Sequence, residues 1–192
     1  MIKKVKQLKK EVGNKVDERL KEFENNKDWF SELCFCILTA NSKAKTALKI
    51  EKEADFLRMN EKELKDTIKK NKHRFHNRKA KFIVEAREFR NIKKILDNER
   101  DKREFLIKNV QGIGMKEASH FLRNVGFKEY AILDRHILNV MKRNKLIDNI
   151  KLNKKRYLEI EEKFRKLAEK LKMNMAELDL YLWYMETGEV LK

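Results

Sequence analysis

The chain has 192 residues, of which 41% are hydrophobic and 41% are charged, and its net charge is +17. This composition excludes a disordered chain, and the length allows one domain or two small lobes with a real core. The positive charge favours a polyanionic partner, although a lysine-rich proteome would give part of the same excess.

Strand signals are nearly absent, and apolar residues recur at helical spacing from one end of the chain to the other. The protein is therefore predicted to be all-α. The expected helices cover residues 2–24, 28–40, 43–52, 61–70, 76–89, 91–96, 99–108, 115–125, 135–144, 154–172 and 174–186. Asn174, with Glu177 three residues later, is expected to cap the last helix, and Gly188 is expected to end it.

The chain has two cysteines, Cys34 and Cys36. Residues two apart on a helix point to different faces, so this pair suits neither a shared metal ion nor a disulfide. No apolar run approaches the length of a membrane span, and there is no signal-peptide pattern. We therefore expect a reduced, cytoplasmic protein with no membrane partner.

The stretch VQGIGMKEASHFLRNVG, residues 110–126, holds three of the five glycines. One helix is expected to end near Lys108 and another to begin near Met115. Gly112 and Gly114 then allow positive φ in the connection and expose backbone amides. The start of the second helix adds unpaired N–H groups and the positive end of the helix dipole, which together bind anions. An ordinary turn between helices would use glycine similarly, but the order of residues resembles the helix-hairpin-helix motif, which grips a DNA phosphate.

Lys116 stands in the first turn of the second helix, where the helix dipole disfavours a cation. A solvated lysine gains nothing there, whereas a nucleophile does, because only a neutral amine attacks carbon. Asp134 follows the apolar run 131–133 and precedes a new helix, so it is expected to be an N-cap. An amine can displace a base from C1′ of a nucleotide, and a nearby carboxylate can stabilise the oxocarbenium-like charge. Taken singly, each residue also fits a structural role.

The ordered set of motifs resembles the helix-hairpin-helix DNA glycosylase superfamily, in which the lysine marks the members that also cut DNA. WFSELCFCILTANSKA (29–44) resembles its early helix and Asn/Gln loop, without a glycine pair in 41–47, and HRFHNRKAKFIVEARE (73–88) resembles its helix with an aromatic residue and Lys-Ala. KEASHFLRNVGF, AILDRHIL and the ending ELDLYLWYMETGEVLK are especially similar to the archaeal-type 8-oxoguanine DNA glycosylases. The chain lacks the four-cysteine cluster of the iron–sulfur branch, and Lys116 distinguishes it from the monofunctional branch that removes alkylated bases.

This resemblance implies two helical lobes with DNA and the active site in the cleft between them. One lobe would comprise residues 1–26 plus 127–192, and the other residues 27–126 with the helix-hairpin-helix at about 105–125. It also implies that the damaged base is flipped out of the stack into a pocket. By position in the motifs, Lys116 is the nucleophile that forms the Schiff base and Asp134 is the catalytic carboxylate.

The resemblance also implies how the lesion and the DNA are held. Phe75 and Trp183 are candidates to sandwich the extruded base, with a role in the core as the alternative. Lys192 and its terminal carboxylate match the family's C-terminal lysine, where an acceptor would favour the N7–H of 8-oxoguanine over guanine. His136 is expected to be structural. Further DNA contacts are expected from Gly112, Gly114, Asn41, Arg74, Arg78 and Arg135.

The sequence thus predicts a monomeric DNA repair enzyme, associated with the nucleoid, that excises 8-oxoguanine from duplex DNA and cleaves the abasic strand by β-elimination. Its partner would be double-stranded DNA that contains 8-oxoguanine or abasic sites. This chemistry needs no cofactor, although the wider superfamily suggests a monovalent cation at the backbone of Val110 and Ile113. Two alternatives stay open: a glycosylase/lyase for another oxidised base, and a non-enzymatic helix-hairpin-helix DNA-binding protein.

Overall fold

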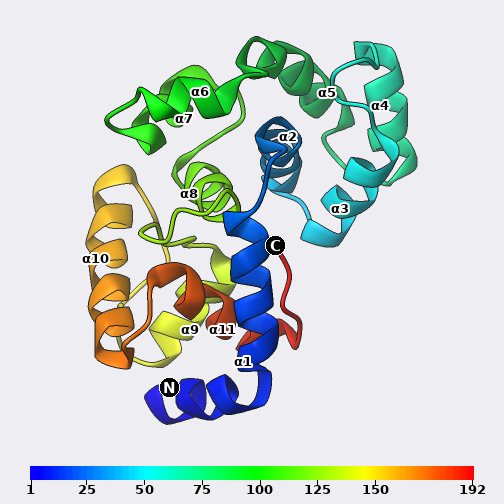
Figure 1. Cartoon of the computed structure of the whole chain (residues 1–192). Helices are drawn as coiled ribbons and strands as arrows, with labels where there is room; N and C mark the ends of the chain where they lie inside the picture. The colour runs from blue at the N-terminus through cyan, green and yellow to red at the C-terminus, as the bar shows by residue number, and fades with distance from the viewer. The chain divides into compact units, whose positions relative to one another are not determined.

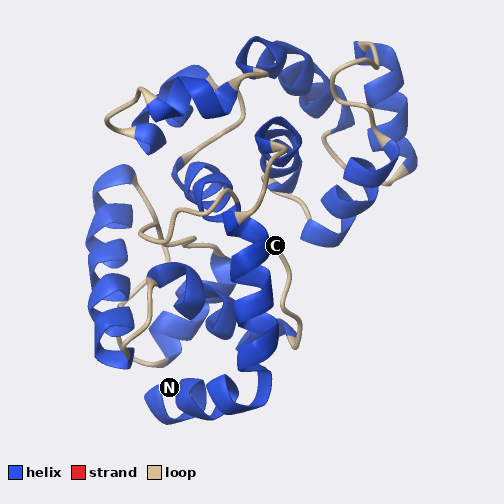
Figure 2. Cartoon of the chain, viewed as in Figure 1, coloured by secondary structure: helices blue, strands red, loops and turns tan.

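The computed structural model describes residues 1–192, and every regular element in it is a helix (Figures 1 and 2). The prediction of an all-α protein is confirmed. The residues group into two compact units: unit 1 is Met1–Asn26 with Leu122–Lys192, and unit 2 is Lys27–Phe121. The second boundary lies inside a helix, whereas the sequence placed it after Gly126. None of the helices combines the length and the apolar character that a membrane crossing requires.

Unit 1 is built around one helix that is buried on most of its sides. Its elements are α1 (Ile2–Glu24), α9 (Arg135–Arg143), α10 (Lys154–Leu171), α11 (Met175–Thr187) and the last turn of α8 (Met115–Asn124). The first eight residues of α11 are all buried, and the helix contacts α1, α9 and α10. A helix without a polar face belongs in the centre of a bundle. The longer α1 instead presents one apolar stripe at helical spacing, namely Val5, Leu8, Val12, Val16 and Phe23.

Unit 2 is organised in the same way around α2. Its elements are α2 (Trp29–Thr39), α3 (Ala44–Glu53), α4 (Glu61–Lys70), α5 (His76–Glu85), the 3-10 helix η1 (Ala86–Phe89), α6 (Ile92–Asp97), α7 (Lys102–Asn109) and most of α8. Every residue of α2 except Ser31 is buried, and the helix contacts α3, α5 and α6. Cys34 and Cys36 lie within it as free thiols, as expected, and burial raises the pKa of Cys34.

Local capping sets most helix ends close to the predicted positions. The side chain of Asn174 accepts the amide of Glu177 at 2.8 Å, so the predicted cap of α11 is confirmed. α7 begins at Lys102, later than expected, because Asp101 caps it by accepting the amide of Glu104 at 2.9 Å. A side-chain acceptor satisfies one of the orphan amides of the first turn, and this fixes where a helix can start.

The C-terminal ends of two helices can be compared with the ends predicted from the sequence. Gly188 ends α11 in the left-handed conformation with φ +73°, as expected. The helix predicted at 76–89 ends instead at Glu85 and tightens into η1. In this last turn Arg87 donates to the carbonyl of Phe56 at 2.8 Å and also to the carbonyl of Met59. These tertiary bonds hold the turn in place, and the sequence pattern gives no sign of them.

Candidate active site

A tight hairpin joins α7 to α8 through residues 110–114, where the glycine pair lies. The amide of Ile113 donates to the carbonyl of Val110 at 3.3 Å and closes the turn. Gly112 has a φ of +83°, and a Cβ there would lie 2.6 Å from the Phe82 ring. Both its conformation and its close approach to an aromatic ring therefore require glycine. Gly114 differs from the expectation, because its φ is not positive.

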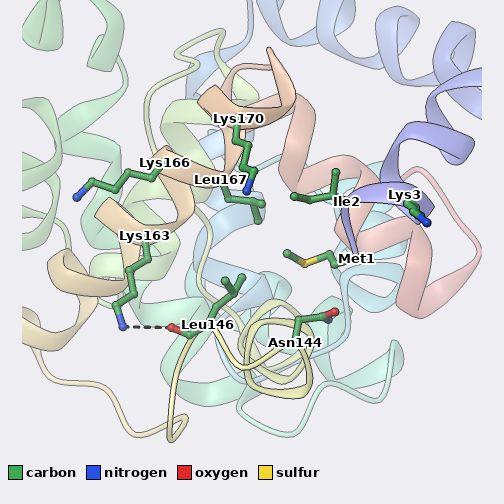
Figure 3. Close-up of a pocket in the computed structure, with 9 residues that line it drawn as sticks. All are labelled: Met1, Ile2, Lys3, Asn144, Leu146, Lys163, Lys166, Leu167 and Lys170. Atoms are coloured by element: carbon green, nitrogen blue, oxygen red, sulfur yellow. Dashed lines mark hydrogen bonds between the residues drawn. The ribbon is translucent and has the colours of Figure 1, made fainter.

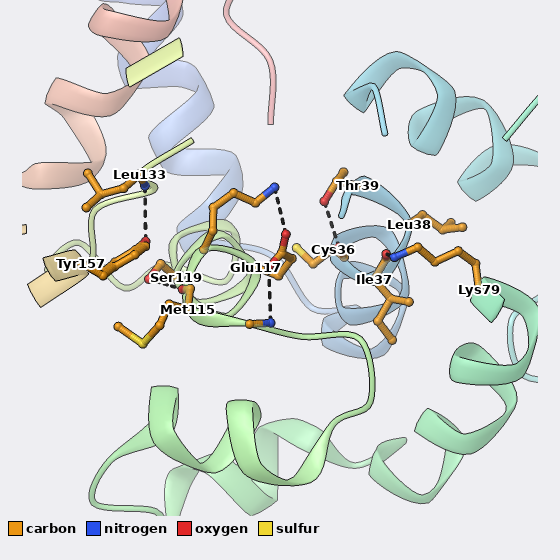
Figure 4. Close-up of polar contacts among 12 residues, drawn as sticks. Cys36, Ile37, Leu38, Thr39, Lys79, Met115, Glu117, Ser119, Leu133 and Tyr157 are labelled. Carbon is orange, nitrogen blue, oxygen red and sulfur yellow. Dashed lines mark hydrogen bonds and ion pairs between the residues drawn. The ribbon is translucent and has the colours of Figure 1, made fainter. Parts of the chain in front are cut away.

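Lys116 lies in the first turn of α8, where the sequence placed it. Its Nζ is 3.0 Å from Oε1 of Glu117, and the two side chains are 27% and 14% exposed. The other carboxylate oxygen of Glu117 accepts the amide of Gly114 at 3.3 Å, as the dashed lines at Glu117 in Figure 4 show. One carboxylate therefore holds both the ε-amino group of Lys116 and a backbone amide of the hairpin.

Three of the last carbonyls of α2 are satisfied by side chains. Thr39 donates to the carbonyl of Cys36 at 2.9 Å, and Lys79 donates to that of Ile37 at 2.5 Å (Figure 4). The Nε2 atom of His73 lies 2.9 Å from the carbonyl oxygen of Leu38. Helix ends leave carbonyls without intrahelical partners, and here Lys79 and His73 supply partners from outside α2, whereas Thr39 does so from its last turn. Lys79 carries a positive charge to the end of the α2 dipole that favours one.

Lys79 is a buried lysine, only 5% exposed. Burial lowers its pKa to about 8, the carboxylate of Glu117 opposes that shift, and the charges of Lys116 and Arg78 add to it. Removal from water disfavours the charged form of an amine, whereas a nearby carboxylate favours it. The charges of Glu117 and Lys116 thus both act on Lys79.

A small hollow of about 260 Å³ in unit 2 brings together four of the predicted site residues from three segments. Its lining consists of Asn41, Phe75, Arg78 and Gly112 together with Ala40, Lys79, Phe82 and Gln111. Asn41 is exposed and has a φ of +60°, which is uncommon for a residue other than glycine. Strained loop residues of this kind concentrate at functional sites, so the geometry is compatible with the expected role of Asn41.

Phe75 is half-buried and lines this hollow, so it is not a core aromatic. The guanidinium carbon of Arg74 lies 4.4 Å from the centre of its ring. The Phe75 amide donates to Nδ1 of His73 at 3.1 Å, so the proton of His73 is on Nε2, which donates to Leu38. Burial lowers the pKa of His73, which favours this neutral form. The start of α5 is therefore tied to the end of α2 through one neutral imidazole.

Asp134 is the N-cap of α9 in unit 1, as predicted, and its side chain accepts the amide of Ile137 at 2.9 Å. The apolar run before it is held by Tyr157, whose hydroxyl donates to the carbonyl of Ala131 at 2.6 Å. The same hydroxyl accepts the amide of Leu133 at 3.3 Å (Figure 4). Arg135, next along the chain, is exposed. A buried tyrosine on α10 therefore fixes the segment that presents Asp134.

The charge of Asp134 also acts on a buried ion pair of unit 1. Arg123 and Asp179 form this pair, and both side chains are only 4% exposed. Burial raises the pKa of Asp179 to about 6; Arg123 opposes the shift, and the charge of Asp134 adds to it. This pair could not be predicted from the sequence, since its members are far apart in the chain.

Trp183 in unit 1 is half-buried, and its ring meets that of His136 edge-on with the centres 5.0 Å apart. Its indole N–H is buried without a hydrogen-bond acceptor. Buried indole donors normally have a partner, so this donor could serve a ligand. Lys192, at the end of the short tail after Gly188, is half-buried.

The structure separates the predicted residues between the two units. The hairpin, Lys116, Asn41, Phe75, Arg74 and Arg78 belong to unit 2, whereas Asp134, Arg135, Trp183 and Lys192 belong to unit 1. A larger hollow of about 640 Å³ also lies in unit 1, lined by lysines and apolar residues of α1, α10 and the end of α9 (Figure 3). None of the predicted site residues lines it.

Sequence reasoning did not assign roles to Lys79 and Glu117, although both lie inside motifs that it singled out. Lys79 belongs to the aromatic and Lys-Ala helix, and Glu117 follows the predicted nucleophile directly. The burial of Lys79, the ion pair of Glu117 with Lys116 and the effect of both charges on Lys79 appear only in the folded chain. The one signal in the sequence is the position of Glu117 directly after the candidate nucleophile.

Comparison with known proteins identifies the family of this chain. Residues 16–173 match the 8-oxoguanine DNA glycosylase family of helix-hairpin-helix type. The chain is 47% identical to the 8-oxoguanine DNA glycosylase/AP lyase of Methanocaldococcus jannaschii, over 100% of this chain and 99% of that protein. It is 44% identical to the Thermoplasma volcanium protein of the same name, over 94% and 92% of the two chains.

Solved structures agree with this result. The crystal structure of the Methanocaldococcus jannaschii glycosylase/lyase, bound to a 15mer DNA containing 8-oxoguanine, has a TM-score of 0.96 and 46% identity over 100% of this chain and 99% of that one. The 8-oxoguanine DNA glycosylase of Thermotoga maritima has a TM-score of 0.93 and 40% identity, over 100% and 98%. Together with the hairpin and its lysine, these matches show that the chain belongs to the helix-hairpin-helix 8-oxoguanine DNA glycosylase family.

Proposed function

We propose that this protein excises 8-oxoguanine from duplex DNA and cleaves the resulting abasic strand. The observation that carries the proposal is a lysine in the first turn of the second hairpin helix, in a chain of this family. Relatives at 40–47% identity bear the name 8-oxoguanine DNA glycosylase/AP lyase, and one of them has been solved with DNA that contains the lesion.

Lys116 would act as the nucleophile. Its neutral amine attacks C1′ of the damaged nucleotide, the bond to the base breaks, and the base leaves with the bonding electrons and takes up a proton. The bond between C1′ and O4′ then breaks and opens the sugar, O4′ takes up a second proton from nitrogen to become a hydroxyl, and a Schiff base between Nζ and C1′ results. Removal of a proton from C2′ then expels the 3′ phosphate by β-elimination, and water releases the lysine. Asp134 would stabilise the positive charge that develops on the sugar as the base departs.

The other predicted residues would hold DNA and lesion. Backbone amides at Gly112 and Gly114 would face a phosphate at the positive end of α8. The side chains of Arg74, Arg78 and Arg135 would add charge, and Asn41 would meet the DNA near the lesion.

The extruded base would be recognised by aromatic side chains and by the C-terminal tail. Phe75 and Trp183 would stack on its two faces, and the tail that ends at Lys192 would supply an acceptor for its N7–H. We further infer that the protein acts as a monomer on chromosomal DNA in the cytoplasm, at the nucleoid.

A set of duplexes that each carry one lesion tests the proposed function. We expect strand cleavage at 8-oxoguanine and at a preformed abasic site, and at most trace cleavage of the same sequence with guanine. Faster cleavage at an oxidised pyrimidine than at 8-oxoguanine would favour a glycosylase/lyase for another lesion. Tight DNA binding without cleavage of any duplex would favour a non-enzymatic DNA-binding protein.

Changing Asp134 to asparagine should separate its cap from its proposed chemical role. Asparagine caps a helix about as well as aspartate, so we expect the melting temperature of the protein to stay nearly the same. The variant lacks the negative charge that would stabilise the sugar cation, so excision of 8-oxoguanine in a single turnover should slow by about 100-fold or more. Full excision activity in a normally folded variant would limit Asp134 to capping α9.

A further inference from the structure

Two charged side chains of unit 2 have no part in the reaction as described above. Lys79 is 5% exposed, and the side chain of Glu117 is 14% exposed. Removing charges from water costs free energy unless they are paired and hydrogen-bonded. A glutamate that only capped α8 would not need the nucleophile as a partner. The charge of the same glutamate also acts on the buried Lys79, so both residues call for an explanation.

Contacts join Lys79 to the end of α2, and they join Glu117 to the hairpin and to the predicted nucleophile (Figure 4). The carbonyl of Ile37 accepts from Nζ of Lys79 at 2.5 Å, which anchors this cation on the end of α2. Lys79 and Glu117 attract one another by charge. Glu117 uses Oε2 to accept the amide of Gly114 at 3.3 Å and uses Oε1 to hold Nζ of Lys116 at 3.0 Å.

We propose that Glu117 and Lys79 are positioning residues for Lys116. Glu117 sets the place of the ε-amino group relative to the backbone of the hairpin, and Lys79 holds the carboxylate of Glu117 in place through its charge. This inference rests on the proposed function, since it assigns the two residues to the reaction of that same lysine.

The physical reason is the freedom of a lysine side chain. Four rotatable bonds let the amine sample many positions, and fixing such a side chain costs entropy. A nucleophile misplaced by about 1 Å can lose about 100-fold in rate. Glu117 also accepts the amide of Gly114 with its other carboxylate oxygen. The position of the Lys116 amine is therefore fixed relative to the same turn that would bind the DNA phosphate. The phosphate and the reacting C1′ belong to one DNA strand, so this turn is the useful reference.

Single-turnover excision of 8-oxoguanine by three variants tests the inference. Glu117→Gln keeps the shape of the side chain but removes its charge, and we expect the excision rate to fall by about 10- to 100-fold. Lys79→Met should reduce the rate by about tenfold. The double variant should excise no more slowly than the slower single variant, because both changes would disturb one series of contacts. The affinity of each variant for the duplex should stay within about threefold of the original, since positioning acts on rate and not on binding.

Matched surface changes serve as controls. Glu104→Gln removes a carboxylate on the first helix of the same hairpin, and Lys81→Met removes an exposed lysine of α5 that pairs with Glu85. Neither should change the excision rate by more than about twofold, because exposed pairs contribute little.

Three results would overturn the inference. In the first, Glu117→Gln excises 8-oxoguanine as fast as the unchanged protein. In the second, the rate losses of the two single variants multiply in the double variant. In the third, a variant loses as much affinity for the duplex as it loses in excision rate. If Lys79→Met does not fold, Glu117→Gln alone decides, because glutamine preserves the volume of the side chain. Failure of the proposed function is a separate result, since the original protein would then cleave no 8-oxoguanine duplex.

Discussion

Replacing Lys116 with glutamine is expected to abolish the covalent complex that borohydride traps between this protein and a duplex containing 8-oxoguanine. Borohydride reduces a Schiff base to a stable amine, and an amide side chain forms no Schiff base. Loss of a catalytic nucleophile commonly reduces a rate by several orders of magnitude, so strand cleavage should fall by about 1000-fold or more. Denaturing gel electrophoresis after reduction measures the trapped complex directly, and glutamine keeps most of the length and polarity of lysine.

A second lysine of the hairpin provides the control for this experiment. Lys108 lies near the end of α7, is 69% exposed and pairs with Glu104. Lys108→Gln removes the same charge from the same motif, so it should lower nonspecific DNA binding slightly and leave trapping intact. If Lys116→Gln still forms the trapped complex in normal yield, another amine is the nucleophile and the central assignment is wrong.

Replacing Arg123 with methionine is expected to lower the free energy of unfolding by about 3–5 kcal/mol, the largest effect on stability that we predict. The guanidinium pairs with Asp179 inside unit 1, donates twice to the side chain of Asn124 and lies over the ring of Phe23. Methionine would fill the space but leave the carboxylate of Asp179 buried without its cation, which is the costly half of a broken ion pair. Urea denaturation of both proteins at one pH measures the difference.

The pH dependence of this loss gives a further check on its cause. Burial holds the pKa of Asp179 at about 6, above its ordinary value. Arg123 lowers that pKa, so in the variant the carboxyl takes up its proton at a higher pH than in the original protein, and below about pH 6 both folded proteins hold it neutral. The difference in unfolding free energy should therefore be largest near pH 8 and should shrink as the pH falls towards 5. A difference that stays constant over this range would attribute the loss to packing.

An exposed arginine of the same unit supplies the control. Arg143 is 61% exposed and pairs with Glu186 at the surface. Its change to methionine should alter the free energy of unfolding by less than about 1 kcal/mol. A partial recovery of stability in the double variant Arg123→Met with Asp179→Leu would show that the unpaired carboxylate, and not the missing arginine, causes most of the loss.

The helices of this protein could be predicted from the sequence because their signals are local. The caps of α9 and α11 depend on one side chain and an amide three residues away, and both were predicted at Asp134 and Asn174. The errors occurred where distant residues intervene. The helix predicted at 76–89 changes to a 3-10 turn where Arg87 reaches the carbonyls of Phe56 and Met59.

The candidate site was predictable to a similar degree. Gly112 and Lys116 belong to a short motif, and their positions in the turn and in the first turn of α8 follow from that motif alone. The glycine pair misled in one respect, since only Gly112 adopts a positive φ. Roles for Glu117 and Lys79 could not be predicted, because they depend on which charges become buried beside one another.

The sequence by itself determined the all-α class, the hairpin with its lysine, and the cap that presents Asp134, since each depends on residues a few positions apart. Only the tertiary structure decided which side chains share an environment: Lys79 at the end of α2, Asp179 with Arg123, and Phe75 with Asn41 at one hollow. The reason is that burial and charge contacts join segments many residues apart. The energy of such a contact depends on the dielectric and on the partners that the completed fold supplies.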